Sequence, residues 1–158
     1  MAARQGGDPN VLLDAVGRAI VEQLQQDGRR SYATIAKAVG RSEAAVRQRV
    51  QRLLEAGVVQ IVAVSDPLQL GFTRQAMIGI RAEGDLQTVA DKLAALDEVD
   101  YVVITAGSFD LLVEVVCGDD EQLLSLLNGT IRTVPGVRDC ETFVYLRLVK
   151  QTYTWGTR

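Results

Sequence analysis

The stretch that decides the fold is residues 31–54, which read SYATIAKAVGRSEAAVRQRVQRLL. Serine is favoured at the start of a helix and glycine just past its end, so the pattern predicts a short helix between Ser31 and Gly40. Ser42 is predicted to cap the next helix in the same way, and Ala56-Gly57 to end it. The expected buried stripe of that next helix is Val46, Val50, Leu53 and Leu54.

Small and apolar residues in this stretch have the spacing of a helix-turn-helix unit. Ala36 leaves room for a crossing helix, Gly40 lies in the turn four residues later, and Val46 packs back inside after six more. An ordinary helical hairpin is the alternative. An amphipathic helix is predicted before the unit, at Leu12–Gln26, and a strand after it, at Val58–Val64.

The charge of the chain is unevenly distributed. The net charge is −3, but residues 1–64 carry nine Lys and Arg against six Asp and Glu, whereas residues 65–158 carry eight against fourteen. A basic segment within an acidic protein favours a local site for a polyanion. A solvated basic face is the alternative.

The predicted third helix combines this charge with the chemistry of base recognition. If its apolar stripe faces inward, then Glu43, Arg47, Gln48 and Gln51 project outward. Arginine suits guanine and glutamine suits adenine, while flanking arginines suit phosphates. The predicted DNA-binding residues are Arg29, Arg30, Ser31, Arg41, Ser42, Glu43, Ala44, Arg47, Gln48, Arg49, Gln51 and Arg52.

The remainder of the chain alternates strands and helices. Predicted strands lie at Ala76–Ala82, Val99–Thr105, Leu111–Cys117 and Val137–Lys150. Two helix faces separate them, marked by Leu86, Val89, Leu93 and Leu96 and by Leu123, Leu124, Leu127 and Ile131. The order βαββαβ predicts a ferredoxin-like α+β sandwich with its helices on one face of the sheet. We expect a second subunit to cover the other face.

Composition argues against several function classes. The chain has no histidine and two cysteines, Cys117 and Cys140, so the usual zinc sites and histidine-dependent nucleophiles are excluded. We therefore expect neither an enzyme nor a metal or other cofactor. No apolar run reaches the roughly 20 residues needed to span a bilayer, and the first ten residues lack the apolar core of a signal peptide. These patterns predict a cytoplasmic protein without a membrane partner.

Six runs of sequence together resemble the Lrp/AsnC (feast/famine) transcription regulators. They are residues 13–14 (LD), 24–29 (LQQDGR), 36–40 (AKAVG), 46–53 (VRQRVQRL), 57–59 (GVV) and 107–113 (GSFDLLV). The resemblance covers roughly residues 11–153. It implies a regulator that binds double-stranded DNA, whose C-terminal domains pair into dimers that assemble further to tetramers or octamers.

The same resemblance implies a small effector, an amino acid, bound between dimers. The implied effector-binding residues are Thr105, Ala106, Gly107, Ser108, Phe109 and Asp110 in one loop, with Thr142 contributed by a neighbouring subunit. Gly107 would let backbone N–H groups approach a carboxylate, and Asp110 would receive the ammonium group. A turn glycine and a turn or capping aspartate are the alternatives.

Together these patterns predict four segments. They are a flexible tail at 1–10, a helix-turn-helix DNA-binding domain at 11–57, a strand and linker at 58–74, and a ferredoxin-like effector-binding and oligomerisation domain at 75–158. The predicted function is a sequence-specific regulator that responds to an amino acid. The alternative is an architectural DNA-binding protein that needs no effector.

Overall fold

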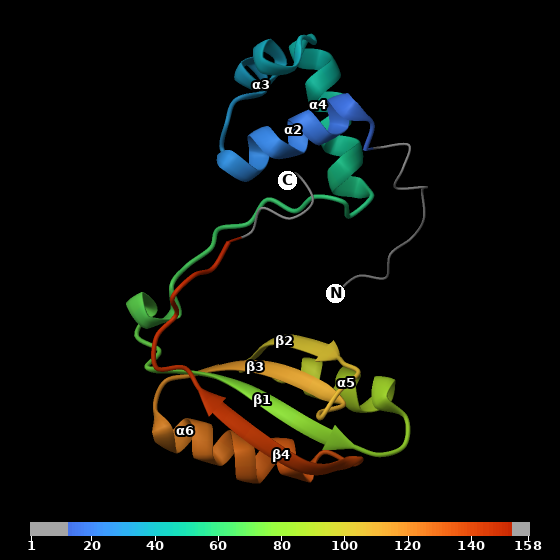
Figure 1. Ribbon diagram of the computed structural model, residues 1–158. Coiled ribbons are helices and arrows are strands. Elements are labelled where there is room, and N and C mark those ends of the chain that lie inside the picture. Colours follow the sequence, from blue (N-terminus) through green and yellow to red (C-terminus); the bar gives the residue numbers. More distant parts are fainter. Residues whose placement is uncertain (1–12, 153–158) are drawn as a thin grey trace. The chain divides into compact units, whose positions relative to one another are not determined.

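The computed structural model describes residues 13–152, which form two compact units (Figure 1). One unit contains the described residues up to Val64 together with those from Lys150 onward, and the other spans Ser65–Val149. The second unit thus begins ten residues before the boundary at residue 75 that the sequence pattern predicts. The expected tail at 1–10 and the expected helix start at Leu12 lie outside the described residues.

The described residues of the first unit form three helices, α2 (Ala15–Gln26), α3 (Tyr32–Val39) and α4 (Glu43–Glu55). Each begins with a side-chain cap, because Asp14, Ser31 and Ser42 accept hydrogen bonds from backbone N–H groups in the first turn. Gly40 ends α3 with φ at +65°, the left-handed conformation that glycine adopts most easily. These caps and this turn confirm the predicted helix-turn-helix arrangement.

The core of this unit is small and lies between the three helices. It consists of Ile20, Leu24, Ile35, Ala36, Val46 and Val50. Leu53 is also buried, but Leu54 is 39% exposed, so its predicted place in the buried stripe is wrong. Consecutive helical residues are about 100° apart, and the step from Leu53 to Leu54 turns the side chain out of the interface.

The second unit has the predicted βαββαβ order. Its elements are β1 (Arg74–Ala82), α5 (Leu86–Ala94), β2 (Val99–Ile104), β3 (Leu111–Cys117), α6 (Asp120–Ser125) and β4 (Val137–Val144). The strands pair antiparallel in the order β2-β3-β1-β4, and α5 and α6 lie on one face of the sheet (Figure 1). Ile78, Ile80, Val113 and Val115 point into this helical layer and are fully buried.

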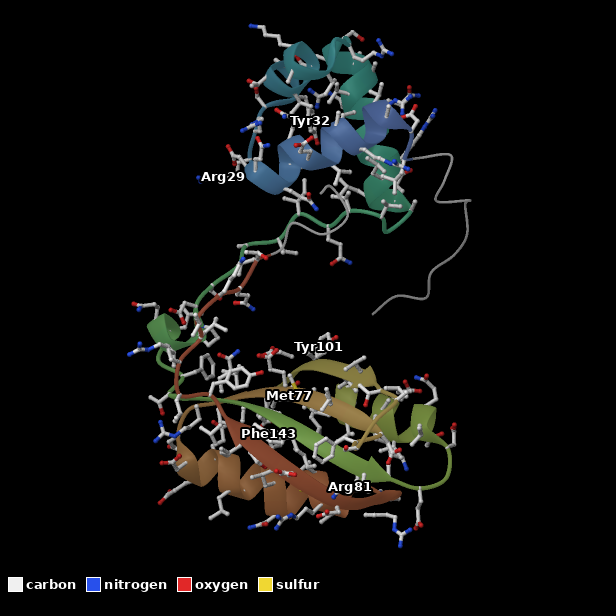
Figure 2. The ribbon with its side chains drawn as sticks, viewed as in Figure 1. Arg29, Tyr32, Met77, Arg81, Tyr101 and Phe143 are labelled. Carbon is white, nitrogen blue, oxygen red and sulfur yellow. The ribbon has the colours of Figure 1, made fainter. Side chains whose placement is uncertain are left out.

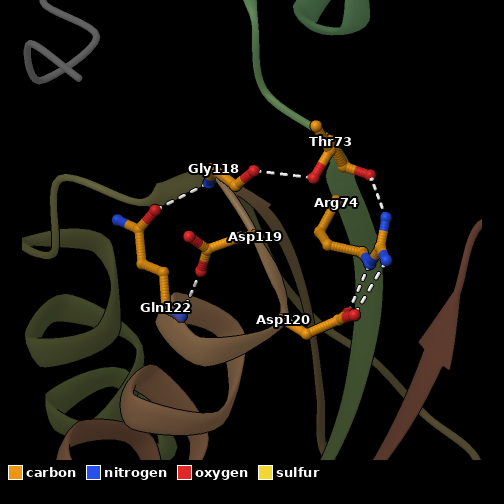
Figure 3. Close-up of polar contacts among 6 residues, drawn as sticks. All are labelled: Thr73, Arg74, Gly118, Asp119, Asp120 and Gln122. Carbon is orange, nitrogen blue, oxygen red and sulfur yellow. Dashed lines mark hydrogen bonds and ion pairs between the residues drawn. The ribbon is translucent and has the colours of Figure 1, made fainter.

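Helix α6 is fixed to the start of β1 by polar contacts (Figure 3). Asp119 caps the helix by accepting the Gln122 N–H at 2.8 Å, and the Gln122 side chain accepts the Gly118 N–H at 2.7 Å. Arg74 donates to both carboxylate oxygens of Asp120. The guanidinium hydrogen bond lowers the pKa of the Asp120 carboxyl below its ordinary value. The loop between sheet and helix is therefore tied at both ends.

Three predictions from the sequence, for two strands and one helix face, are wrong. Val58–Val64 is not a strand, because these residues pair with no other strand among residues 13–152, and a strand is defined by such pairing. The last strand ends at Val144 instead of Lys150, because its ladder with β1 stops at the Ala76–Val144 pair. The Tyr145 N–H still donates to the Gln75 carbonyl at 2.8 Å, and the chain then bends at Leu146. Leu124 is 58% exposed, whereas Leu126 is buried where α6 widens into a π-helical turn at Leu126–Thr130.

The sheet face opposite the helices carries a row of mostly apolar side chains that no helix or strand within residues 13–152 covers. Tyr101, Glu114, Met77 and Phe143 are register partners across all four strands, which places them on one face of the sheet. Figure 2 labels Tyr101, Met77 and Phe143. Tyr101 is 51% exposed and Phe143 is 44% exposed. Partial burial, reinforced by the neighbouring Glu114 carboxylate, raises the pKa of Tyr145 on this face to about 12. We call these four residues the open-face row.

Candidate functional site

The outward side of α4 is built as the sequence predicts. Val46, Val50 and Leu53 are buried, which leaves the intervening side chains on the solvent side of the helix. The exposed residues of the predicted set on this side are Ser42, Glu43, Ala44, Arg47, Gln48, Gln51 and Arg52. A helix with long donors and acceptors on one side has the shape and chemistry to enter a major groove.

Arg47 has partners on two sides within the unit. Its guanidinium lies 5.1 Å from the centre of the Tyr32 ring, and one of its nitrogens is 3.0 Å from a carboxylate oxygen of Glu43. Gln51 donates to Glu55 at 3.1 Å. These contacts are exposed, so the polar groups remain open to another partner.

Arg49 is held differently from the other predicted phosphate contacts. It donates two parallel hydrogen bonds, at 2.7 and 2.8 Å, to the carboxylate of Asp14, the residue that caps α2. The Gly17 backbone N–H and the Arg49 guanidinium together hold the pKa of the Asp14 carboxyl below its ordinary value. Arg49 therefore joins the start of α2 to the middle of α4. Two of its guanidinium nitrogens already donate hydrogen bonds to Asp14.

This link has a testable pH dependence. Because the folded-state pKa of Asp14 is lowered, its stabilising effect is present above an unfolded-state pKa of about 3.9 and is lost as the pH falls through the folded value. We expect Asp14→Asn to keep the helix cap but to lose the ion pair, and Asp14→Ala to lose both. Thermal melts between about pH 7 and about pH 3 should rank wild type, Asn and Ala variants in that order at neutral pH. The advantage of the wild type over both variants should shrink in acid, whereas the difference between Asn and Ala, which comes from the helix cap, should persist. Equal melting temperatures at neutral pH would contradict the assignment.

The other predicted arginines are less constrained. Arg30 donates to the side chains of Gln23 and Gln26. Within residues 13–152, the side chain of Arg41 donates only to the Gly40 carbonyl, at 3.2 Å. The side chains of Arg29 and Arg52 have no partner among residues 13–152. Ser31 is engaged as a helix cap and shares a hydrogen bond with Thr34. Arg29, Arg41 and Arg52 are thus available to an external anion.

The predicted effector loop, residues 105–110, is a closed turn with an exposed tip. The Thr105 N–H donates to the Asp110 carbonyl at 2.9 Å, and the Thr105 hydroxyl donates to the Phe109 carbonyl at 2.6 Å. Ala106, Gly107 and Ser108 are exposed between these anchors. The Asp110 carboxylate accepts the Ala82 N–H at 2.9 Å, so Asp110 fastens the loop to the end of β1.

Phe109 anchors the loop on the open face of the sheet. Its ring lies directly over Gly79 of β1, and a Cβ atom at position 79 would be 2.6 Å from the ring. Phe109 also meets Phe143 edge-on, with ring centres 6.1 Å apart, and the Arg81 guanidinium lies 5.0 Å from its centre. Sequence reasoning missed Arg81. The available signal was Gly79, because a glycine inside a strand often marks a place where another group comes close to the backbone.

Thr142 is not brought next to this loop. It is the register partner of Ile78, whose side chain points into the helical layer, whereas Phe109 and Arg81 lie on the opposite face. Of the predicted effector set, the structure therefore groups only the loop residues. A contribution of Thr142 from a neighbouring subunit stays a prediction.

Residues 13–152 hold neither a cluster of metal-ligating side chains nor a membrane-spanning helix. They contain no group of three or more cysteine or carboxylate side chains placed to hold a metal ion. They also contain no helix of the length and apolarity that crossing a membrane requires. Both cysteines are free thiols, with Cys117 buried in β3 and Cys140 half-buried in β4. Burial raises the pKa of the Cys117 thiol.

Family models match both units of the chain. Residues 13–54 match the AsnC-type helix-turn-helix domain, and residues 72–158 match the C-terminal dimeric alpha+beta barrel domain of AsnC-type regulators. Among curated relatives, HTH-type transcriptional regulator FL11 of Pyrococcus abyssi is 33% identical over 90% of this chain and 95% of its own length. Regulatory protein AsnC of Escherichia coli K12 is 30% identical over 87% of this chain and 93% of its own length.

Solved structures agree with this assignment. The structure of Escherichia coli AsnC superposes with a TM-score of 0.79 at 28% identity, covering 89% of this chain and 97% of that one. A transcriptional regulator from Neisseria meningitidis, solved as a complex with L-Met, shares the fold with a TM-score of 0.79 at 24% identity, covering 89% and 94%. The relatives are transcriptional regulators, not enzymes. The chain belongs to the AsnC family of helix-turn-helix transcriptional regulators.

Proposed function

We propose that this regulator reads a specific duplex sequence with α4 and that a small effector, an amino acid, changes its DNA affinity or oligomeric state. The observation that carries the proposal is the outward side of α4, which presents Arg47, Gln48 and Gln51 from a domain of the AsnC helix-turn-helix type. Such a regulator works where duplex DNA and free amino acids share one compartment, which we take to be the cytoplasm.

We assign each side chain to base edges or to phosphates according to the partners that it has within the unit. Arg47, Gln48 and Gln51 contact base edges, with Glu43 and Ala44 beside them at the start of the helix. Arg29, Arg30, Arg41 and Arg52 contact phosphates, together with the hydroxyl groups of Ser31 and Ser42. Arg49 is omitted from the DNA contacts, because Asp14 occupies its guanidinium.

Substitution of two arginines on α4 separates base readout from charge. We expect Arg47→Ala to weaken binding to a cognate site by about 1–3 kcal/mol and to relax base preference at one position. Arg52→Ala should weaken binding to all sequences similarly and reduce the slope of log affinity against log salt by about 1. Titration of each variant at several salt concentrations checks both. Unchanged affinity of both variants at every salt concentration would refute this readout.

We propose the loop tip as the effector contact and Asp110 as the residue that holds the tip in place. Two observations support this role: the backbone of Ala106, Gly107 and Ser108 is exposed, and the Neisseria relative was solved with L-Met. Exposed backbone N–H groups suit the carboxylate of an amino acid.

A gel-shift experiment tests the whole proposal. The protein is titrated onto the DNA upstream of its own gene, with and without each of the twenty amino acids. We expect a specific shift whose midpoint or stoichiometry changes with at least one amino acid. A shift that is indifferent to all twenty would favour the architectural alternative, and the absence of any sequence preference would overturn the proposed readout.

The open-face row supports a second copy of the chain as the partner of the C-terminal unit. An aromatic and apolar surface of this kind is typical of a homodimer interface, and the matching family domain is dimeric. A two-fold dimer would present two α4 helices to a pseudo-palindromic site, with half-sites about one helical turn or a multiple of it apart. Further assembly to tetramers or octamers remains part of the proposal.

A further inference from the structure

Arg47 is the arginine on α4 whose guanidinium is held by an aromatic ring. The ring of Tyr32 lies 5.1 Å from it on one side, and Glu43 lies 3.0 Å from one of its nitrogens. Both charged side chains stay more than half exposed, at 61% and 51%. Arg52, on the same helix, has no side-chain partner among residues 13–152. The Arg47 fork is therefore held in place yet accessible.

A guanidinium that rests against an aromatic face keeps its in-plane N–H groups free. Those groups match the O6 and N7 acceptors that guanine presents in the major groove. Because Tyr32 already restricts the side chain, Arg47 loses less conformational freedom when it binds than an unsupported arginine does. This favours a contact with defined geometry over a diffuse contact with phosphate.

Glu43 adds selectivity between DNA sequences by repulsion, whereas Arg47 adds it by attraction. A carboxylate on the groove-facing side of a helix is repelled by phosphates, which lowers affinity for every sequence. It can regain this loss only where it accepts a hydrogen bond, and the N4 amino group of cytosine is the matching donor. Glu43 and Arg47 lie one helical turn apart and thus face neighbouring positions in the groove.

We propose that Tyr32, Glu43 and Arg47 form one base-selecting unit that specifies a guanine, with Arg47 as the reader. Tyr32 acts as a positioning residue, and Glu43 penalises sites that offer it no amino donor. The inference rests on the proposed function, in which α4 enters the major groove, and it goes further by assigning the base and the residues that set the preference.

The test uses the full-length protein and a library of duplexes with random sequence. Selection with the wild type is expected to enrich a half-site with a guanine that Arg47→Ala no longer enriches. Affinities are then measured for duplexes with guanine or adenine at that position. We expect Tyr32→Phe to keep the preference, because the ring remains, and Tyr32→Leu to reduce it roughly tenfold. Both variants lack the hydroxyl group, so they differ in the aromatic face alone.

Glu43→Gln provides a second arm that leaves the helical core untouched, because Glu43 is exposed. It is expected to bind random duplex a few-fold more tightly and to discriminate less between cytosine and thymine at the position next to that guanine. Unchanged discrimination in both Tyr32→Leu and Glu43→Gln would overturn the inference while sequence-specific binding stands. If the wild type enriches no sequence from the library, the proposed function itself fails.

Discussion

A valine at position 79 is expected to displace Phe109 and abolish binding of the proposed amino-acid effector. Gly79 is buried in β1, and a Cβ there would lie 2.6 Å from the Phe109 ring. Overpacking of this kind costs typically about 1–3 kcal/mol of stability. Phe109 belongs to the candidate effector loop and is held between Arg81 and Phe143, so its displacement should move the loop. Thermal melts and calorimetric titration with amino acids measure the two effects.

Gly107 provides the matched control within the same loop. A Cβ at this position meets no other atom within 4 Å, and its backbone is outside the left-handed region, so the fold should tolerate valine there. Gly107→Val is therefore expected to keep the wild-type melting temperature while its bulk blocks the ligand. Binding of an amino acid to Gly107→Val with wild-type affinity would contradict the proposed contact at the loop tip. A Gly79→Val protein as stable as wild type would contradict the packing of the Phe109 ring against position 79.

Met77→Asp is expected to convert the protein from a dimer to a monomer. Met77 lies between Glu114 and Phe143 in the open-face row, where a second copy would bury the new carboxylate beside an existing one. Loss of the dimer removes the advantage of holding two half-sites at once, which typically amounts to about 10²–10⁴ in affinity. Sedimentation velocity gives the mass of the protein, and titration onto a two-half-site duplex gives the affinity.

Leu124→Asp is the control for this substitution. Leu124 is a 58% exposed apolar residue of α6, on the helical layer that lies on the other face of the sheet. The same change of side chain there should leave the mass and the DNA affinity unchanged. A dimeric Met77→Asp protein would exclude the open face as the interface, and a monomeric Leu124→Asp protein would assign the interface to the helical layer.

Local signals in the sequence account for much of the fold. Ser31, Gly40 and Ser42 act on the few residues beside them, so their capping and turn roles could be read directly from the sequence. The strand β3 was predicted to the residue, because a run of apolar β-prone residues between turn signals is a strong local pattern.

Contacts between distant residues could not be read in this way. Asp14 and Arg49 are separated by 35 positions, and only the packing of α2 against α4 brings them together. For the same reason the sequence could not show that Asp14 pairs with Arg49, the residue predicted to contact phosphate. The missing strand at Val58–Val64 has a related cause, because a β-prone run says nothing about whether a pairing partner is present. The packing of the Phe109 ring over Gly79 likewise depends on the register of the sheet.

The open-face row has a consequence for gene dosage. If the chain binds its operator only as a pair through this face, then in the regime where most chains are single the amount of pairs rises with the square of the amount of chain. Halving the expression of the gene would then lower the concentration of pairs about fourfold, by mass action. A promoter under this regulator would respond more steeply to the copy number of the regulator gene than one controlled by a monomeric protein.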